Sequence, residues 1–178
     1  MRVIQASIPH FREKKRGVIL NMGSISGLTV TTPGGIMYSA SKFAMEGLTE
    51  GLAMQLEPFG VRVLLVEPSF FRTNWLVGGY VTPAKEMTKD YVSGPIDKFL
   101  QAYPKRHGQQ PGDPVRAAKI IIDIATEVGI GADEEVKKCT RIPLGNDAVD
   151  FGRAYFKKLQ HDFDTMESVA RSADFDQK

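Results

Sequence analysis

The chain has 178 residues, the size of one ordinary domain, and its 42% hydrophobic and 25% charged residues are typical of a globular protein. Its 23 basic and 21 acidic residues leave a net charge of +2, which is too balanced to indicate a nucleic acid or a membrane surface as a partner. Cys139 is the single cysteine, so the sequence offers no disulfide framework and no zinc spacing, and we expect a reducing, cytoplasmic setting without a metal site.

The first half of the chain is predicted to alternate between helices and strands. Apolar residues at helical spacing predict a first helix, and a short run of branched residues before a glycine predicts a buried strand. The longest aliphatic run, residues 63–66, lies in the clearest strand and is far too short to cross a bilayer. In chain order, the predicted elements are a helix at 1–13, a strand at 17–23, a helix from 38 to about 57 and a strand at 61–68.

This order of strand, loop, helix and strand is a βαβ unit. It implies a parallel sheet with right-handed crossovers and therefore an α/β fold. Ligands of such sheets bind beyond the carboxyl ends of the strands. Ser24 follows the first predicted strand and residues 69–73 follow the second, so we expect both at the same edge of the sheet.

The second half of the chain is predicted to be less regular. Residues 74–112 mix aromatic and aliphatic side chains with prolines and glycines, and two interpretations stay open: a lid over a bulky, hydrophobic substrate, or an irregular excursion that packs on the core. Beyond it, we expect a helix from 114 to about 127, a short strand within 139–145, and an amphipathic helix at 147–172 that covers the core.

Tyr38 and Lys42 lie one helical turn apart, so their side chains should share a face of the long helix. A phenol, with a reference pKa near 10, holds its proton too tightly to act as a base at neutral pH, and a nearby ammonium favours the phenolate. Tyr38 could then exchange a proton with a substrate whose oxygen is held by Ser24. A side chain cannot supply the hydride that would convert a carbonyl to an alcohol, so a cofactor must.

Taken singly, these signals are weak, because Ser24 or Thr73 alone is usually a cap or loop residue and a Tyr–Lys pair at this spacing often occurs by chance. Together, "GVILNMGSISG" and "YSASKFAMEGLTEGLAMQLEPFGVRVLLVEPSFFRT" make the chain resemble the short-chain dehydrogenase/reductase family, clearly over residues 1–75 and more loosely to the end. The resemblance implies a partial Rossmann-like, doubly wound parallel sheet, in which residues 1–178 form a single truncated domain with the last three strands and their flanking helices.

The resemblance also implies an activity and the residues that carry it. It implies an NAD(P)-dependent oxidoreductase that interconverts a ketone and a secondary alcohol. Tyr38 matches the family's catalytic acid/base, Lys42 matches the lysine that promotes its ionisation, and Ser24 matches the serine that orients the substrate. The positions that match contacts to NADP or NAD are Tyr38, Lys42, Pro68, Phe71 and Thr73.

The departures from the family's pattern concern the cofactor. Ser69 stands where the family usually has a glycine after the proline. The family's opening strand, glycine-rich turn and helix, which bind the pyrophosphate, and its catalytic asparagine have no counterpart in this sequence, which thus resembles a member without its N-terminal, cofactor-binding half. If the 178 residues are the whole polypeptide, we expect weak NAD(P) binding; if they are a fragment, we expect the parent to be an active reductase.

An alternative function is that of a catalytically impaired remnant, which acts as a binding or dimerisation module. In the family, the helices that correspond to residues 1–13 and 38–57 commonly pair across a dimer. Both helices are predicted here, so a homodimer through them is expected.

Overall fold

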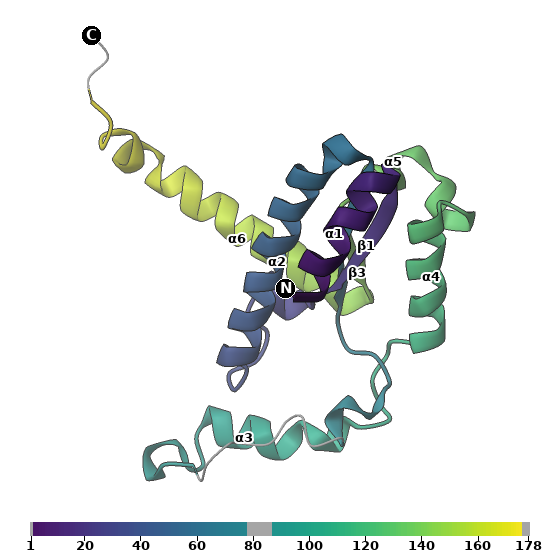
Figure 1. The fold of residues 1–178 in the computed structure, drawn as a ribbon. Coiled ribbons are helices and arrows are strands. Elements are labelled where there is room, and N and C mark those ends of the chain that lie inside the picture. The colour runs from purple at the N-terminus through teal and green to yellow at the C-terminus, as the bar shows by residue number, and fades with distance from the viewer. Residues whose placement is uncertain (1, 78–86, 176–178) are drawn as a thin grey trace.

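The structure is a computed structural model that describes residues 2–77 and 87–175. At its centre is a parallel sheet with helices on both faces (Figure 1). Its strands, in spatial order, are β1 (Gly17–Met22), β2 (Val61–Pro68) and β3 (Arg141–Leu144). The first residue of β1 pairs with the first of β2, and the parallel register continues from there. The predicted α/β class and parallel sheet are therefore confirmed.

Four of the α-helices, α1, α2, α4 and α6, agree with the predicted helices to within two residues at each end. The α-helices are α1 (Arg2–Lys14), α2 (Ile36–Leu56), α3 (Pro95–Ala102), α4 (Pro114–Thr126), α5 (Glu134–Lys137) and α6 (Asn146–Arg171). Short 3₁₀ turns connect them: η1 (Ile25–Gly27), η2 (Glu57–Phe59), η3 (Asn74–Leu76), η4 (Lys89–Tyr91), η5 (Pro104–Arg106) and η6 (Gly129–Ala132). Helix α3, within the segment predicted to be irregular, and the short α5 were not among the predicted elements.

The core lies on both faces of β2, the central strand. Leu65 and Val66 are fully buried, as expected of a strand whose sequence is a continuous apolar run. On one face, Val61 and Val63 pack with the apolar sides of α1 and α2, and on the other, Leu64 and Val66 pack with α4. This sandwich holds the carboxyl ends of β1 and β2 side by side, where the predicted site residues lie.

Gly60 sets the entry into β2. Its φ of +66° is in the left-handed region, and a Cβ there would lie 2.7 Å from the carbonyl oxygen of Lys15. The turn before β2 therefore packs directly on the turn before β1, and this close approach fixes where both strands begin.

The segment predicted as a lid or an irregular excursion has local structure. Its described residues form η3, η4, α3 and η5, and Figure 1 shows α3 set apart from the sheet, beyond the lower end of α2. Residues 78–86 of this segment lie outside the described residues.

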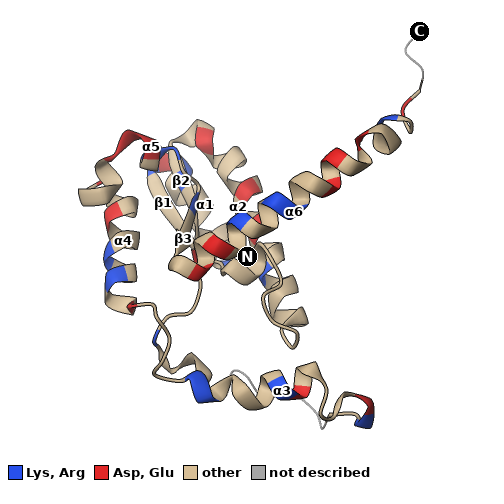
Figure 2. Cartoon of the chain, turned by 180° about the vertical axis from the view of Figure 1, so that it is seen from behind, with Lys and Arg blue, Asp and Glu red and all other residues tan. Residues whose placement is uncertain are grey.

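Helix α6 corrects one expectation. Its early residues Ala148 and Gly152 are buried, but every side chain from 160 to 171 is exposed, and Figures 1 and 2 show the helix projecting away from the body. The prediction that this helix covers the core is therefore wrong for its second half. Its apolar stripe, which includes Phe163 and Met166, lies uncovered among the charged residues that Figure 2 marks.

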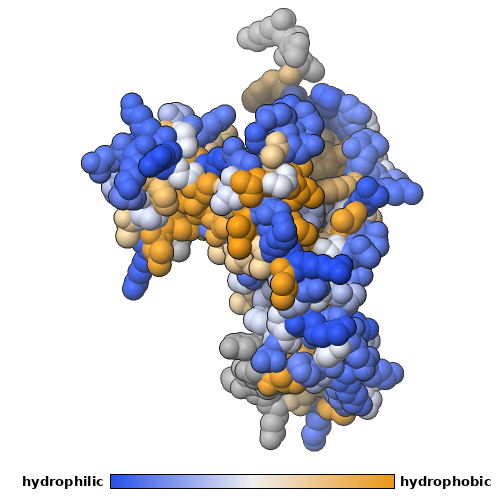
Figure 3. Space-filling view, turned by 90° about the vertical axis from the view of Figure 1, so that its right-hand side faces the viewer, coloured by the Kyte–Doolittle hydropathy of each residue, from blue (hydrophilic) through white to orange (hydrophobic). Residues whose placement is uncertain are grey.

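Apolar residues are also exposed on the body, as Figure 3 shows from the side of α4. On β1, Leu20 and Met22 are 38% and 52% exposed. Among the described residues β1 pairs only with β2, so its other edge is open.

Candidate active site

Ser24 is positioned by the turn that follows β1. It caps η1, where its Oγ accepts a hydrogen bond from the backbone N–H of Ser26 at 3.1 Å. The serine is 7% exposed, so this turn holds the hydroxyl in a fixed, buried place. Because the Oγ is used as an acceptor, its own proton can be donated to a further oxygen.

A glycine brings this turn against α2. A Cβ on Gly27 would lie 2.6 Å from Oε1 of Glu46 and 2.8 Å from the carbonyl oxygen of Lys42. Only a residue without a side chain allows so close an approach between η1 and the helix. The approach carries Ser24 to the part of α2 where Tyr38 and Lys42 lie.

Tyr38 and Lys42 lie on the same face of α2, as their spacing predicts. The Lys42 Nζ is 5.7 Å from the centroid of the Tyr38 ring and donates a hydrogen bond to the Met22 carbonyl oxygen at 2.8 Å. That bond ties the first turns of α2 to the end of β1. Burial lowers the pKa of Lys42.

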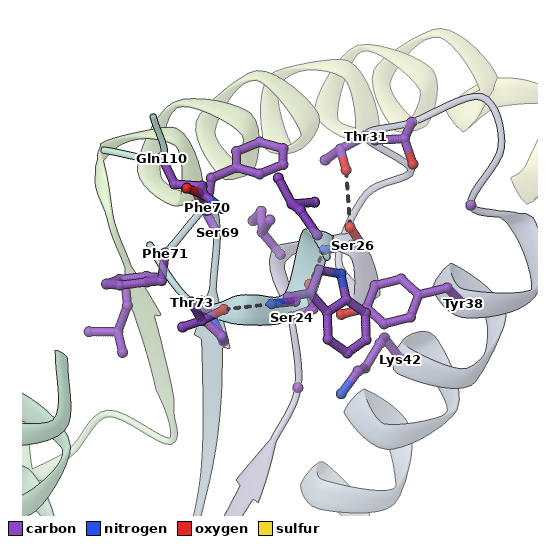
Figure 4. A pocket seen from close by; sticks show the side chains of 18 of the residues that line it. Ser24, Ser26, Thr31, Tyr38, Lys42, Ser69, Phe70, Phe71, Thr73 and Gln110 are labelled. Carbon is purple, nitrogen blue, oxygen red and sulfur yellow. Dashed lines mark hydrogen bonds between the residues drawn. The ribbon is translucent and has the colours of Figure 1, made fainter. Parts of the chain in front are cut away.

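All the sequence-predicted site residues border a single cavity of about 710 Å³ (Figure 4). Tyr38 and Lys42 come from α2, Ser24 comes from the end of β1, and the others come from the loop after β2. The residues of this predicted set that line the cavity are Ser24, Tyr38, Lys42, Pro68, Phe71 and Thr73. The structure thus brings together groups that are up to 49 positions apart in the sequence.

The loop after β2 has its own internal order. The Ser69 Oγ accepts a hydrogen bond from the backbone N–H of Phe70, and the Thr73 Oγ1 accepts one from the N–H of Trp75 at 3.3 Å. The second bond caps η3, which places the Trp75 ring 5.8 Å from the Tyr38 ring, centroid to centroid. Sequence reasoning did not single out Trp75 as a neighbour of Tyr38.

Aromatic side chains form another wall of the cavity. Phe99, in the middle of α3, and Tyr103 pack with their rings tilted and their centroids 4.7 Å apart, and Phe70 meets Tyr103 edge to face at 6.3 Å. Burial and the nearby Tyr38 raise the pKa of Tyr103, so its hydroxyl stays protonated at neutral pH. Because α3 supplies part of this wall, at least that part of residues 74–112 belongs to the cavity.

A charged network that the sequence did not reveal lies behind η1. Arg141, at the start of β3, binds Glu67 of β2 at 2.7 Å and Glu50 of α2 at 2.6 Å, and also binds Glu46. Burial and the Glu46 carboxylate raise the pKa of Glu67 to about 7, against the opposing effect of Arg141. The carboxylates Glu46 and Glu67 are nearly fully buried, so this network joins β2, β3 and α2 directly beneath the turn that carries Ser24.

Two searches of the described residues found no candidate. Within residues 2–77 and 87–175, no group of three or more His, Cys, Asp and Glu side chains is arranged to hold a metal ion. A search of the same residues finds no helix with the length and apolar character that spanning a bilayer requires.

Comparison with known proteins gives matches over most of the chain. The family model described as short chain dehydrogenase matches residues 1–78. An uncharacterized oxidoreductase, YusZ of Bacillus subtilis, is 30% identical over 154 residues, which cover 82% of this chain and 49% of the relative. A 3-ketodihydrosphingosine reductase of Bacteroides thetaiotaomicron is 35% identical over 102 residues, covering 57% of this chain and 36% of the relative.

The fold matches a solved structure closely. A short-chain dehydrogenase from Streptomyces avermitilis superimposes with a TM-score of 0.78 at 33% identity, covering 98% of this chain and 59% of that one. The chain spans about half the length of the curated relatives it matches. The similarity therefore extends through α6, whereas the family model ends just after η3.

Proposed function

The chain belongs to the short-chain dehydrogenase/reductase family, and we propose that it carries the catalytic groups of an NAD(P)-dependent oxidoreductase that interconverts a ketone and a secondary alcohol. The observation that carries this proposal is the convergence of Ser24, Tyr38 and Lys42 on one cavity. A relative named as a reductase of 3-ketodihydrosphingosine supports a ketone as the substrate.

Each of the three side chains has a distinct role in the proposed reaction. The Ser24 hydroxyl, which accepts from the Ser26 N–H, donates its proton in a hydrogen bond to the substrate oxygen. The Tyr38 hydroxyl transfers its proton to that oxygen as the carbonyl becomes an alcohol, and takes it back in the reverse direction. The positive charge of Lys42, beside the Tyr38 ring, favours the phenolate that this transfer leaves behind.

The residues present fit the nicotinamide end of a dinucleotide. An ammonium has three donors, and the Lys42 Nζ uses one of them on the Met22 carbonyl oxygen, so it retains donors for the ribose hydroxyls of NADP or NAD. Pro68, Phe71 and Thr73 border the same cavity and would hold the nicotinamide side of the cofactor. When bound, the nicotinamide supplies or accepts the hydride.

We further propose that the substrate is apolar beyond its reacting group. One wall of the cavity consists largely of aromatic and aliphatic side chains, and burying an apolar molecule there is favourable by about 25 cal/mol for each Å² removed from water. The apolar residues of this wall are Phe70, Trp75, Leu76, Ile96, Phe99, Leu100 and Tyr103. A lid function for this segment stays a prediction.

The test is ketone-dependent oxidation of NADPH or NADH, followed by the loss of nicotinamide absorbance. Methyl ketones of increasing chain length serve as substrates for the wild type and for Tyr38→Phe. The variant should be slower by at least about 100-fold, because it lacks the proton that general acid catalysis requires. Tyr91→Phe, which changes an exposed tyrosine outside the cavity, is the control. Equal rates for the wild type and Tyr38→Phe would refute the proposed role of Tyr38 as the proton donor.

A dimerisation role, alone or beside catalysis, is favoured by one observation. The outer surfaces of α1 and α2 expose apolar side chains: Val3 is 82%, Phe43 is 39% and Met54 is 77% exposed. Pairing of α1 and α2 with a second copy would cover them. Light scattering over a range of concentrations tests this: the mass should approach twice that of the chain, and a constant monomer mass would refute the pairing.

A further inference from the structure

Gln110 combines burial with an unpaired side chain. It lies between η5 and α4 and is 5% exposed. Among the described residues, neither its side-chain oxygen nor its side-chain nitrogen has a hydrogen-bond partner, although both atoms are buried. A buried amide without partners costs folding free energy, which a protein recovers when a ligand satisfies the group.

The backbone around Gln110 is, by contrast, firmly held. Its carbonyl oxygen accepts two hydrogen bonds from the Arg72 guanidinium, at 3.1 and 3.3 Å. Two residues on, the Gly112 N–H donates to the Phe70 carbonyl oxygen at 3.0 Å, and the Gly112 carbonyl accepts from the Arg72 N–H at 2.9 Å. The unpaired carboxamide is therefore attached to a well-ordered backbone.

Gln110 lies where two cavities meet. Gln110 lines the 710 Å³ cavity of the candidate active site and also an adjoining cavity of about 300 Å³ beside the start of α6. Phe70, Leu76 and Tyr103 likewise border both. In Figure 4, Gln110 and Tyr38 lie on opposite sides of the pocket. A molecule that extends from Tyr38 along the aromatic wall would bring its far end to Gln110.

We propose that the Gln110 carboxamide binds a neutral polar group, such as a hydroxyl, at the end of an elongated apolar substrate opposite its reacting carbonyl. This inference rests on the proposed function. A carboxamide carries no charge and offers two donor hydrogens and an acceptor oxygen, so it suits a group that both donates and accepts. The charged residues that border the adjoining cavity, Arg106 and Asp147, have opposite signs and give no preference for an ionic end group.

Two matched ligand series test the subsite: unsubstituted 2-alkanones, and 2-alkanones of the same chain lengths with a hydroxyl on the terminal carbon. Varying the length finds the spacing that spans the cavity. Trp75 is the single tryptophan of the chain and lines the cavity, so its fluorescence reports binding of either series. NADPH oxidation with the same ketones is measured in parallel.

At one chain length, the wild type should bind the hydroxyketone about 3- to 10-fold more tightly than the parent ketone, as one net hydrogen bond allows. In Gln110→Met, a variant of similar length that cannot pair with a hydroxyl, this preference should vanish or reverse while the parent ketone still binds. Gln55→Met, on the exposed side of α2, is the control and should keep the wild-type preference.

The outcomes separate the subsite from the proposed function. If the wild type binds and reduces both series without preferring the hydroxyketones, the subsite is refuted and the proposed function is not. The same holds if the preference survives in Gln110→Met. Failure of both series to bind and to be reduced would overturn both. If Gln110→Met does not fold, the comparison of the two series in the wild type still decides.

Discussion

Glu67→Gln should remove a pH dependence from the stability of this domain. Glu67 lies near the end of β2, is 2% exposed and contacts Arg141 at 2.7 Å. Burial and the neighbouring Glu46 carboxylate raise its pKa from 4.5 to about 7. Glutamine has nearly the shape of the protonated glutamic acid and can still accept from Arg141, but it does not titrate.

The sign and the magnitude follow from proton linkage. Because the pKa of Glu67 is higher in the folded state, the folded protein holds the proton more tightly than the unfolded chain does. The resulting stabilisation is fully present below pH 4.5 and is lost as the pH rises to about 7. At about 1.4 kcal/mol per pH unit, the loss is on the order of 3 kcal/mol.

Urea unfolding followed by circular dichroism measures this loss, at about pH 5 and about pH 7.5, where proton linkage predicts different stabilities. Because part of the stabilisation is already lost at about pH 5, the wild type should lose about 2 kcal/mol more between the two conditions than Glu67→Gln loses. Glu50→Gln, which removes a 57% exposed carboxylate from the same arginine, should keep the wild-type dependence. If wild type and Glu67→Gln have the same pH dependence, the buried network does not titrate as argued.

Two further substitutions test how the site is assembled. Gly27→Ala would place a Cβ 2.8 Å from the carbonyl oxygen of Lys42. We therefore expect urea titrations to show a free energy of unfolding that is lower by about 1–3 kcal/mol. An unchanged free energy of unfolding would contradict the close contact of η1 with α2. Lys42→Met removes the charge beside Tyr38 and the hydrogen bond to Met22, and should lower kcat for ketone reduction by about 100-fold or more; a wild-type kcat would exclude Lys42 from the chemistry.

The sequence was sufficient where a signal is local. The apolar runs at 17–22 and 61–66 identify strands because the central part of a parallel sheet is buried on both faces. The four-residue spacing of Tyr38 and Lys42 places them on one helix face, because that is the geometry of an α-helix. Ser24 could be assigned to the same edge because strand order determines where the loops of a βαβ unit emerge.

Other features depend on contacts that no local pattern encodes. Arg141 meets Glu46 across 95 positions of sequence, so the network appears only once β3 lies beside β2. Trp75 reaches Tyr38 because Thr73 caps the 3₁₀ turn that contains Trp75. Gln110 lies two residues before Gly112, whose backbone is hydrogen-bonded to Phe70 and Arg72 far away in the sequence. The second half of α6 has the amphipathic pattern of a covering helix, but the described residues give it no surface to cover.

The most direct test of the central claim is the fate of deuterium from NADPH labelled at C4 of the nicotinamide. Two forms of the cofactor are used, with the deuterium on one or the other face of the nicotinamide ring at C4. The protein is incubated with each form and a methyl ketone, and the alcohol is analysed by mass spectrometry. We expect one form to transfer its deuterium to the carbinol carbon, and Tyr38→Phe to slow this transfer greatly. Alcohol that forms without the label from either cofactor, or labelled alcohol that forms equally fast in Tyr38→Phe, would contradict this expectation.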